Sequence, residues 1–436
     1  MVLPVLTLLG IAYASFIPFE IRPRTLEQAW HIFRHMPYLD LGIESRADWV
    51  ANLLLYIPFG VLLYAWLDSR RRPLQVKALL GLAVLGFGTA LAIGIEFGQI
   101  FFAPRTVSLN DLLAESIGLA LGIACWVIFK QVLLPRLSAL NSKGEEALKS
   151  GLILYILVFA MVSLFPFDFL ISFSELSWKW KSESGRLHTL MPGCSPSLRC
   201  LVMKAGEMAA AVPLGILFVL IWGRSLRFRI VAAALFGLCT ALVVEGLQFF
   251  LASGETRLFS VLTKSLGVML GAWIGFAGFN FTMERVTTPQ AQRILKGLLV
   301  AYGVVLLKLN GWLDGEWLSR AQGLKGVSWE MFIPFYYHYF SSELTAMMSL
   351  IANAGLYAPF GAFVFLLGIN RNEPRTSMKT AGLLAALTAA VLESGRLFLP
   401  GKHPDYTNLL IAALSASLTA LICRWVFTLA EPRATT

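Results

Sequence analysis

Stretches of apolar residues about as long as a membrane is thick recur from one end of the chain to the other. Several run for about 18–22 residues with few or no charges, which is the length that a helix needs to cross the hydrocarbon core of a bilayer. Of the 436 residues only 14% are charged, whereas a soluble domain carries about 25%. The chain is therefore predicted to be an all-α, polytopic membrane protein rather than a globular domain with a single anchor.

The first apolar stretch, residues 2–19, is interpreted as a retained helix. It continues directly into "PFEIRPR" and has no basic segment before it, whereas a cleaved signal peptide begins with a basic region. Counted with this stretch, about twelve transmembrane helices are predicted. They cover residues 2–19, 50–67, 78–102, 112–133, 151–170, 205–222, 229–251, 260–280, 294–312, 346–368, 380–399 and 408–428.

The spans follow a pattern that occurs three times. The second span of each copy contains Pro-Xaa-Gly, in "ANLLLYIPFGVLL", "GEMAAAVPLGILF" and "ANAGLYAPFGAFV". The third span of each copy carries a glutamate, and Glu96, Glu245 and Glu393 are 149 and then 148 residues apart. We therefore predict three tandem four-helix repeats, at residues 1–140, 141–290 and 291–436. An even number of spans per copy gives all copies the same orientation.

Basic residues predict which side of the membrane each loop occupies. The short connections between second and third spans read "DSRRRPLQVK", "GRSLRFR" and "NRNEPRTSMK", and the links between copies are basic too. Because cytoplasmic loops carry the excess of Lys and Arg, we expect cytoplasmic N- and C-termini. The net charge of +10 is then mainly a topology signal, and no nucleic-acid partner is predicted. The opposite loops contain aromatic, amphipathic segments typical of interfacial helices.

The five cysteines point to no metal site. Cys125, Cys239 and Cys423 fall inside apolar spans, where they are expected to be small buried residues. Cys194 and Cys200 lie in a loop assigned to the outer side, where an oxidising compartment would allow a disulfide. That pairing stays open, because facing Cβ atoms cannot be assumed from sequence. Neither a metal nor a cofactor is predicted.

The first copy gathers polar side chains at the outer end of its bundle. Glu96 and Gln99 are three residues apart and share one helix face. A carboxylate facing lipid is costly, so Glu96 should face the bundle interior or a wet cavity. Structural hydrogen bonding alone is the alternative reading of this cluster. The predicted ligand-binding residues are Asn52, Glu96, Gln99, Arg105, Asp111 and Glu115.

This pattern resembles the VanZ-like family of bacterial membrane proteins. The resemblance is carried in order and spacing by Asn52, Pro58, Phe59, Gly60, Glu96, Gln99, Arg105, Asp111 and Gly118. Glu115 stands where the family usually has Asn, so any role of that amide does not transfer. The resemblance implies a multi-pass protein of the bacterial cytoplasmic membrane and a link to resistance against glycopeptide antibiotics such as teicoplanin. It implies no established biochemical activity.

The other two copies depart from the pattern. In the second, Gly254 and Ser260 replace the Arg and the Asp, and in the third Arg396 replaces the Gln. Arg396 is one turn from Glu393, so an intramembrane ion pair is expected there. The first copy is therefore predicted to carry the site. The secondary candidates are Glu207, Glu245, Gln248, Asn353, Glu393 and Arg396.

Three functions remain open for the outer polar cluster. It could bind the head group of a membrane lipid, a lipid-linked saccharide or a peptidoglycan precursor, with Arg105 contacting an anionic group. It could instead catalyse a reaction on such a lipid, with Glu96 or Asp111 as general base. A transporter or flippase is the least favoured of the three functions. Transporter sites usually lie near the midplane of the membrane, whereas here the copies are parallel and their polar groups lie at one face.

Overall fold

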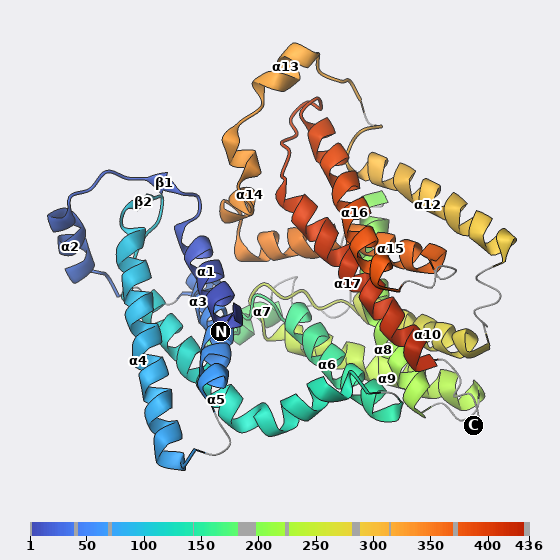
Figure 1. Ribbon diagram of the computed structural model, residues 1–436, viewed down its shortest axis with the longest axis horizontal. Helices are drawn as coiled ribbons and strands as arrows, with labels where there is room; N and C mark the ends of the chain where they lie inside the picture. The colour runs from blue at the N-terminus through green and yellow to red at the C-terminus, as the bar shows by residue number, and fades with distance from the viewer. Residues whose placement is uncertain are drawn as a thin grey trace. The chain divides into compact units, whose positions relative to one another are not determined.

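The computed structural model describes residues 2–38, 42–68, 72–142, 144–181, 198–222, 226–280, 288–313, 315–368 and 374–430. Over these residues the chain forms sixteen α-helices, one 3-10 helix and a two-stranded ribbon (Figure 1). It divides into two compact units. The first consists of Met1–Ser138, Phe165–Ser172 and Leu251–Ser253, and the second of Ala139–Leu164, Phe173–Phe250 and Gly254–Thr436.

The first unit is a bundle of four helices closed at one end by a loop ribbon. Its helix α1 packs against α3 and α4, and α3 also packs against α4. Strands β1 and β2 pair antiparallel, with Glu20 opposite Ala103, so the segment after α1 is tied to the segment after α4. The elements are α1 Val2–Phe16, β1 Glu20–Ile21, α2 Leu26–Arg34, α3 Ile43–Leu67, α4 Leu74–Gln99, β2 Phe102–Ala103 and α5 Leu109–Ala139.

The second unit holds the remaining helices, which run from green to red in Figure 1. Helix α8 packs closely against α10, and α15 and α16 both pack against α17. The elements are α6 Glu145–Ser163, α7 Phe173–Lys181, α8 Leu198–Trp222, α9 Leu226–Phe249, α10 Leu258–Asn280, α12 Pro289–Leu309, α13 Arg320–Lys325, η2 Trp329–Phe332, α14 Tyr336–Tyr339, α15 Glu343–Gly368, α16 Pro374–Arg396 and α17 Thr407–Ala430.

Nine helices within the described residues are long and apolar enough to cross a membrane. They are α3, α4, α5, α6, α8, α9, α10, α15 and α17. The prediction of an all-α, polytopic membrane protein is thereby confirmed. The count of twelve is not, because α1 is shorter, at 15 residues, and α12 and α16 are not among the nine.

The Pro-Xaa-Gly sequences let pairs of helices approach closely. Each proline lies inside a helix that continues through it, at Pro58, Pro213 and Pro359. The glycine two residues later faces a backbone carbonyl of another helix, and a Cβ atom on Gly60 would lie 2.6 Å from the Leu119 oxygen. Only a glycine fits such a close backbone approach. The motif therefore sets the spacing of α3 and α5 in the first unit.

The segments predicted to be interfacial form short helices, α2, α7, η2 and α14. Helix α2 begins with a capping box between Thr25 and Gln28. Leu26 and Trp30 are exposed on it, as expected for a helix whose apolar face lies in a membrane interface. Of the two cysteines that a disulfide could join, Cys194 lies outside the described residues, so its pairing with Cys200 stays open.

Candidate functional site

Asp111 is held at the start of α5 by two side-chain donors. The Asn52 amide, from α3, donates to Asp111 Oδ1 at 2.8 Å, and the Ser108 hydroxyl donates to Oδ2 at 2.7 Å. The Asp111 backbone N–H donates back to the Ser108 oxygen at 3.2 Å. A carboxylate that accepts on both oxygens is fixed in one orientation. The predicted convergence of Asn52 and Asp111 is thus present in the structure.

Glu96 and Glu115 lie close to Asp111 and are almost fully buried. Glu96 is 2% exposed and Glu115 3% exposed, and Tyr56 from α3 is 1% exposed. One carboxyl oxygen of each glutamate, Oε2, and the Tyr56 hydroxyl have no hydrogen-bond partner within the described chain. The Tyr56 hydroxyl lies against the Glu115 carboxyl group, and Glu115, Asp111 and Arg105 all lie close to Glu96. Three carboxyl groups therefore share one buried region with one arginine close by.

Gln99 and Arg105 point instead to the end of α1. The Gln99 amide donates to the Ser15 carbonyl at 3.1 Å, and Arg105 Nε donates to the Ile17 carbonyl at 2.8 Å. Arg105 also donates to the Ala14 carbonyl. The last carbonyls of a helix lack partners within it, so these donors complete the end of α1. The contact of Arg105 with an anionic ligand remains a prediction.

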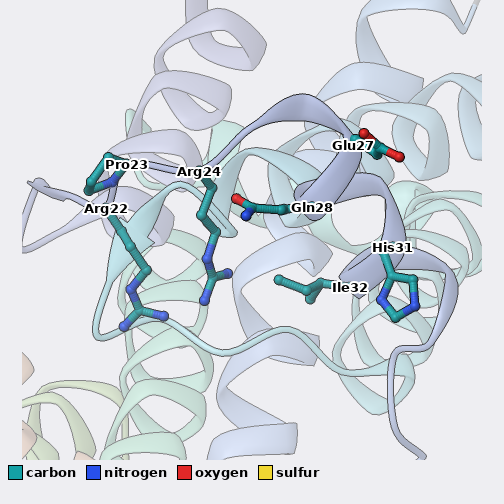
Figure 2. Close-up of a pocket in the computed structure, with 7 residues that line it drawn as sticks. All are labelled: Arg22, Pro23, Arg24, Glu27, Gln28, His31 and Ile32. Carbon is teal, nitrogen blue, oxygen red and sulfur yellow. The ribbon is translucent and has the colours of Figure 1, made fainter.

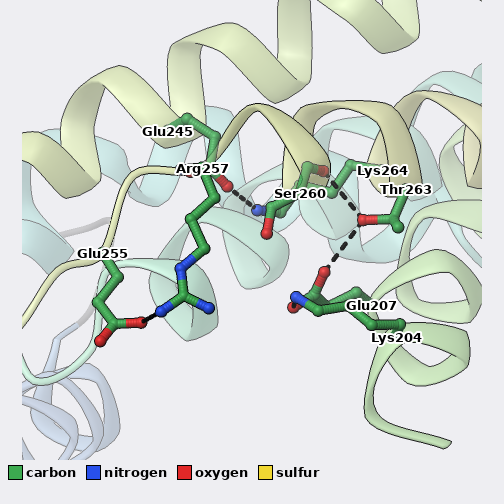
Figure 3. A network of polar contacts seen from close by, with 8 residues as sticks. All are labelled: Lys204, Glu207, Glu245, Glu255, Arg257, Ser260, Thr263 and Lys264. Carbon is green, nitrogen blue, oxygen red and sulfur yellow. Dashed lines mark hydrogen bonds and ion pairs between the residues drawn. The ribbon is translucent and has the colours of Figure 1, made fainter. Parts of the chain in front are cut away.

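In the second unit the corresponding glutamate, Glu245, is paired (Figure 3). Lys264 on α10 forms an ion pair with Glu245, whose other oxygen accepts the Arg257 backbone N–H at 3.0 Å. Glu207 is paired as well, with Lys204 at 2.6 Å and with the Thr263 hydroxyl at 3.0 Å. Gln248, like Gln99, donates to a carbonyl at the end of an earlier apolar helix, in this case that of Ser163 on α6 at 2.8 Å.

In the segment that follows, Glu393 is also fully partnered. Arg396 donates to Glu393 at 2.9 Å, the Asp405 backbone N–H donates at 2.9 Å and the Asn408 amide donates at 2.8 Å. The expected pair of Glu393 and Arg396 is therefore present. Asn353 takes no part in it, because its amide reaches Ser349 one turn back on α15 at 3.4 Å.

These contacts distinguish Glu96 from Glu245 and Glu393. Glu245 and Glu393 each have a cationic partner and a backbone N–H donor. Glu96 instead shares its region with two further carboxyl groups, those of Glu115 and Asp111. Lys264 lies 149 residues after Glu115, the same interval that separates Glu96 from Glu245, so the charge at this position is reversed between the two. Burial without a paired charge marks Glu96 and Glu115 as the more unusual arrangement.

A pocket beside α2 contains residues that the sequence analysis did not single out. Figure 2 shows the side chains of Arg22 and Arg24 extending side by side, with Gln28 next to Arg24 and with Ile32 and His31 on the far side. The pocket is an open depression of about 680 Å³, and the acidic side chain of Glu27 also lines it. Arg24 Nη1 donates to the Ile100 carbonyl at 3.0 Å, just beyond the end of α4 that carries Glu96 and Gln99. The two arginines in "EIRPRTLEQ" were the available signal, but nothing in the sequence indicated that Arg24 contacts the chain just beyond α4.

No metal site is found in the described part of the chain, where no three His, Cys, Asp or Glu side chains are placed to hold an ion.

Long apolar helices with polar clusters at their ends define a polytopic integral membrane protein. Residues 5–130 and 141–279 match the model of the VanZ/LLP1 family. This match covers more than half of the 436 residues, so the chain belongs to that family. No curated protein and no solved structure matches the chain.

Proposed function

We propose that the chain consists of three tandem VanZ-like repeats of four spans each, with α1, α12 and α16 as membrane spans beside the nine longer apolar helices. Equivalent contacts support this. The Gly60 contact with Leu119 is matched by Gly215 with Val268 and by Gly361 with Ala416. In the first two copies the apolar helix is also followed by a phenylalanine with positive φ, 66° at Phe19 and 63° at Phe167, a rare state for so bulky a residue.

The proposed location is the bacterial cytoplasmic membrane, with both termini in the cytoplasm. The basic connections between the second and third spans and the basic links between copies support this orientation. The polar end of the first bundle, with Glu96 and the α2 pocket, then lies at the outer face.

The proposed function is binding of an envelope lipid or a lipid-linked glycan or peptidoglycan precursor at this outer face. The observation that carries it is the pocket lined by Arg22 and Arg24 at the end of α4. Arginine recognises phosphate through paired N–H donors, and phospholipids and polyprenyl-linked precursors carry phosphate. Partly exposed Asn52 and Asp111 supply an amide and a carboxylate for hydroxyl groups nearby. An effect on glycopeptide resistance would follow from holding such a precursor.

Lipid retention by the purified protein tests this proposal. Native mass spectrometry of the protein in anionic and in zwitterionic lipid should show retained anionic lipid. The variant Arg22→Ala with Arg24→Ala should lose most of it. Arg34→Ala is the matched control, since Arg34 lies on α2 over the Trp30 ring and does not line the pocket. Equal retention by both variants would contradict the proposal, and glycopeptide susceptibility of cells carrying them provides the second measurement.

The alternative is an enzyme acting on the same class of lipid. Asp111 favours it, because this carboxylate is partly exposed and oriented by Asn52 and Ser108, as a general base needs to be. Asp111→Asn should then abolish turnover of a lipid-linked substrate while leaving its retention nearly unchanged. Loss of retention and turnover together would favour binding alone.

A further inference from the structure

Glu96 and Glu115 present a charge problem that the rest of the bundle does not solve. Both are nearly fully buried, and each has a carboxyl oxygen without a hydrogen-bond partner within the described residues. The ionisable groups that act on them are Asp111, Arg105 and Tyr56. If all three carboxyl groups were ionised, the single positive charge of Arg105 would leave the region with an excess of two negative charges.

The hydrogen bonds distinguish Asp111 from the two glutamates. Asp111 accepts from the Asn52 amide and from the Ser108 hydroxyl, one donor on each oxygen. Arg105 donates to the Ala14 and Ile17 carbonyls at the end of α1. Glu96 and Glu115 are left without a cation of their own, and burial strongly disfavours an unpaired carboxylate.

The other glutamates show how this chain neutralises a carboxylate when it is ionised. Lys264 balances Glu245, and Arg396 balances Glu393. Neither solution exists in the first unit, because Glu115 stands where the second copy has Lys264, and Gln99 stands where the third has Arg396. The remaining way to neutralise a carboxylate is to add a proton.

We infer that Glu96 and Glu115 form a proton-binding site inside the first unit, in which their carboxyl groups carry protons at neutral pH. The Tyr56 hydroxyl, which lies against Glu115, is the third group of the site. Asp111 is partly exposed and lies close to both glutamates, so proton release from the glutamates changes the charge next to the proposed head-group contact. This site goes beyond the proposed lipid binding and does not depend on it.

Infrared spectroscopy of the purified protein measures the protonated carboxyl groups directly, through their carbonyl stretching band and its shift in D2O. The band should be present in the wild-type protein at neutral pH. Glu96→Gln and Glu115→Gln should each remove part of it, and the double variant should remove all of it. Glu245→Gln and Glu393→Gln are the controls, and neither should change it. A wild-type protein without this band at neutral pH would overturn the inference, whatever the variants do.

The variant Glu115→Lys tests the charge argument while Glu96 keeps its carboxyl group. Glu115→Lys installs in the first unit the arrangement that Lys264 forms with Glu245. It should pair with Glu96, so the whole band should vanish in a protein that still folds. If half of the band persisted, Glu96 would not respond to a facing cation, and the inference would be wrong. Lipid retention is measured separately, so an intact band with failed retention rejects only the proposed function.

Discussion

Replacing Glu245 with glutamine is expected to destabilise the protein far more than the same change at Glu96. Glu245 and Lys264 form an ion pair in which their side chains are only 2% and 12% exposed. The glutamine can still accept the Arg257 N–H, which now donates over 3.0 Å. The substitution therefore removes mainly the negative charge of Glu245. Its removal leaves the Lys264 ammonium group buried without its partner.

The size of this loss follows from the burial of Lys264. Removing one partner of a buried ion pair costs about 3–5 kcal/mol. Because Lys264 keeps a little exposure, water can reach it in part, and we expect the lower end, about 3 kcal/mol. That is roughly a hundredfold in the folding equilibrium. Glu96→Gln leaves no cation of its own unpaired, so its cost should stay within about 1 kcal/mol, the scale of one hydrogen bond.

Equilibrium unfolding in mixed micelles, followed by circular dichroism, gives the comparison. The double variant Glu245→Gln with Lys264→Met separates charge from packing. Replacing both partners of a buried pair by uncharged groups is often neutral, so the double variant should recover most of the stability lost by Glu245→Gln. Equal losses for Glu96→Gln and Glu245→Gln, or a double variant no more stable than the single one, would refute the reasoning.

Three further predictions follow from other contacts. Gly60→Ala and Gly215→Ala should each cost about 1–3 kcal/mol by overpacking, because the new Cβ would meet a carbonyl oxygen; wild-type unfolding midpoints would contradict this. A cysteine replacing Ser142 in a cysteine-free background should react only with reagents applied from the cytoplasmic side, and labelling from outside would reverse the topology. Burial raises the pKa of Asp68, but Lys130 and Trp126 outweigh this and lower it, so its stabilising effect should be present at neutral pH and lost as acid protonates it. The unfolding difference between wild type and Asp68→Asn should therefore shrink at low pH, and a constant difference would contradict it.

The membrane spans could be predicted from the sequence because their signal is local. Length and lack of charge alone define such a helix, and every predicted span falls on a helix of the structure. Boundaries were less predictable. Helix α3 begins at Ile43, earlier than the apolar stretch from residue 50, because a helix can continue past its apolar part into the interface. The apolar stretch to residue 102 ends in strand β2, which pairs with β1.

The site was predictable only in part, because its contacts depend on packing. The common face of Glu96 and Gln99 follows from helix geometry, yet the two side chains meet different partners. Gln99 and Arg105 reach α1, whose end is brought there by a strand pairing between short loops. No periodicity in the sequence encodes that pairing. The pocket beside α2 escaped prediction for the same reason, since the Ile100 carbonyl anchors Arg24 from 76 residues away.

The three proposed copies hold their second and fourth helices at the same close spacing, because each has a glycine facing a carbonyl at Gly60, Gly215 or Gly361. In the first two copies the residue one turn before that carbonyl, Glu115 or Lys264, lies beside a buried glutamate. Lys264 forms an ion pair with that glutamate, so the second copy leaves no unpaired buried carboxylate at this position. Glu115 adds a second acid instead. Proteins depart from local stability chiefly where function requires it, so we expect the acid pair of the first copy to serve the function of this membrane protein rather than its stability.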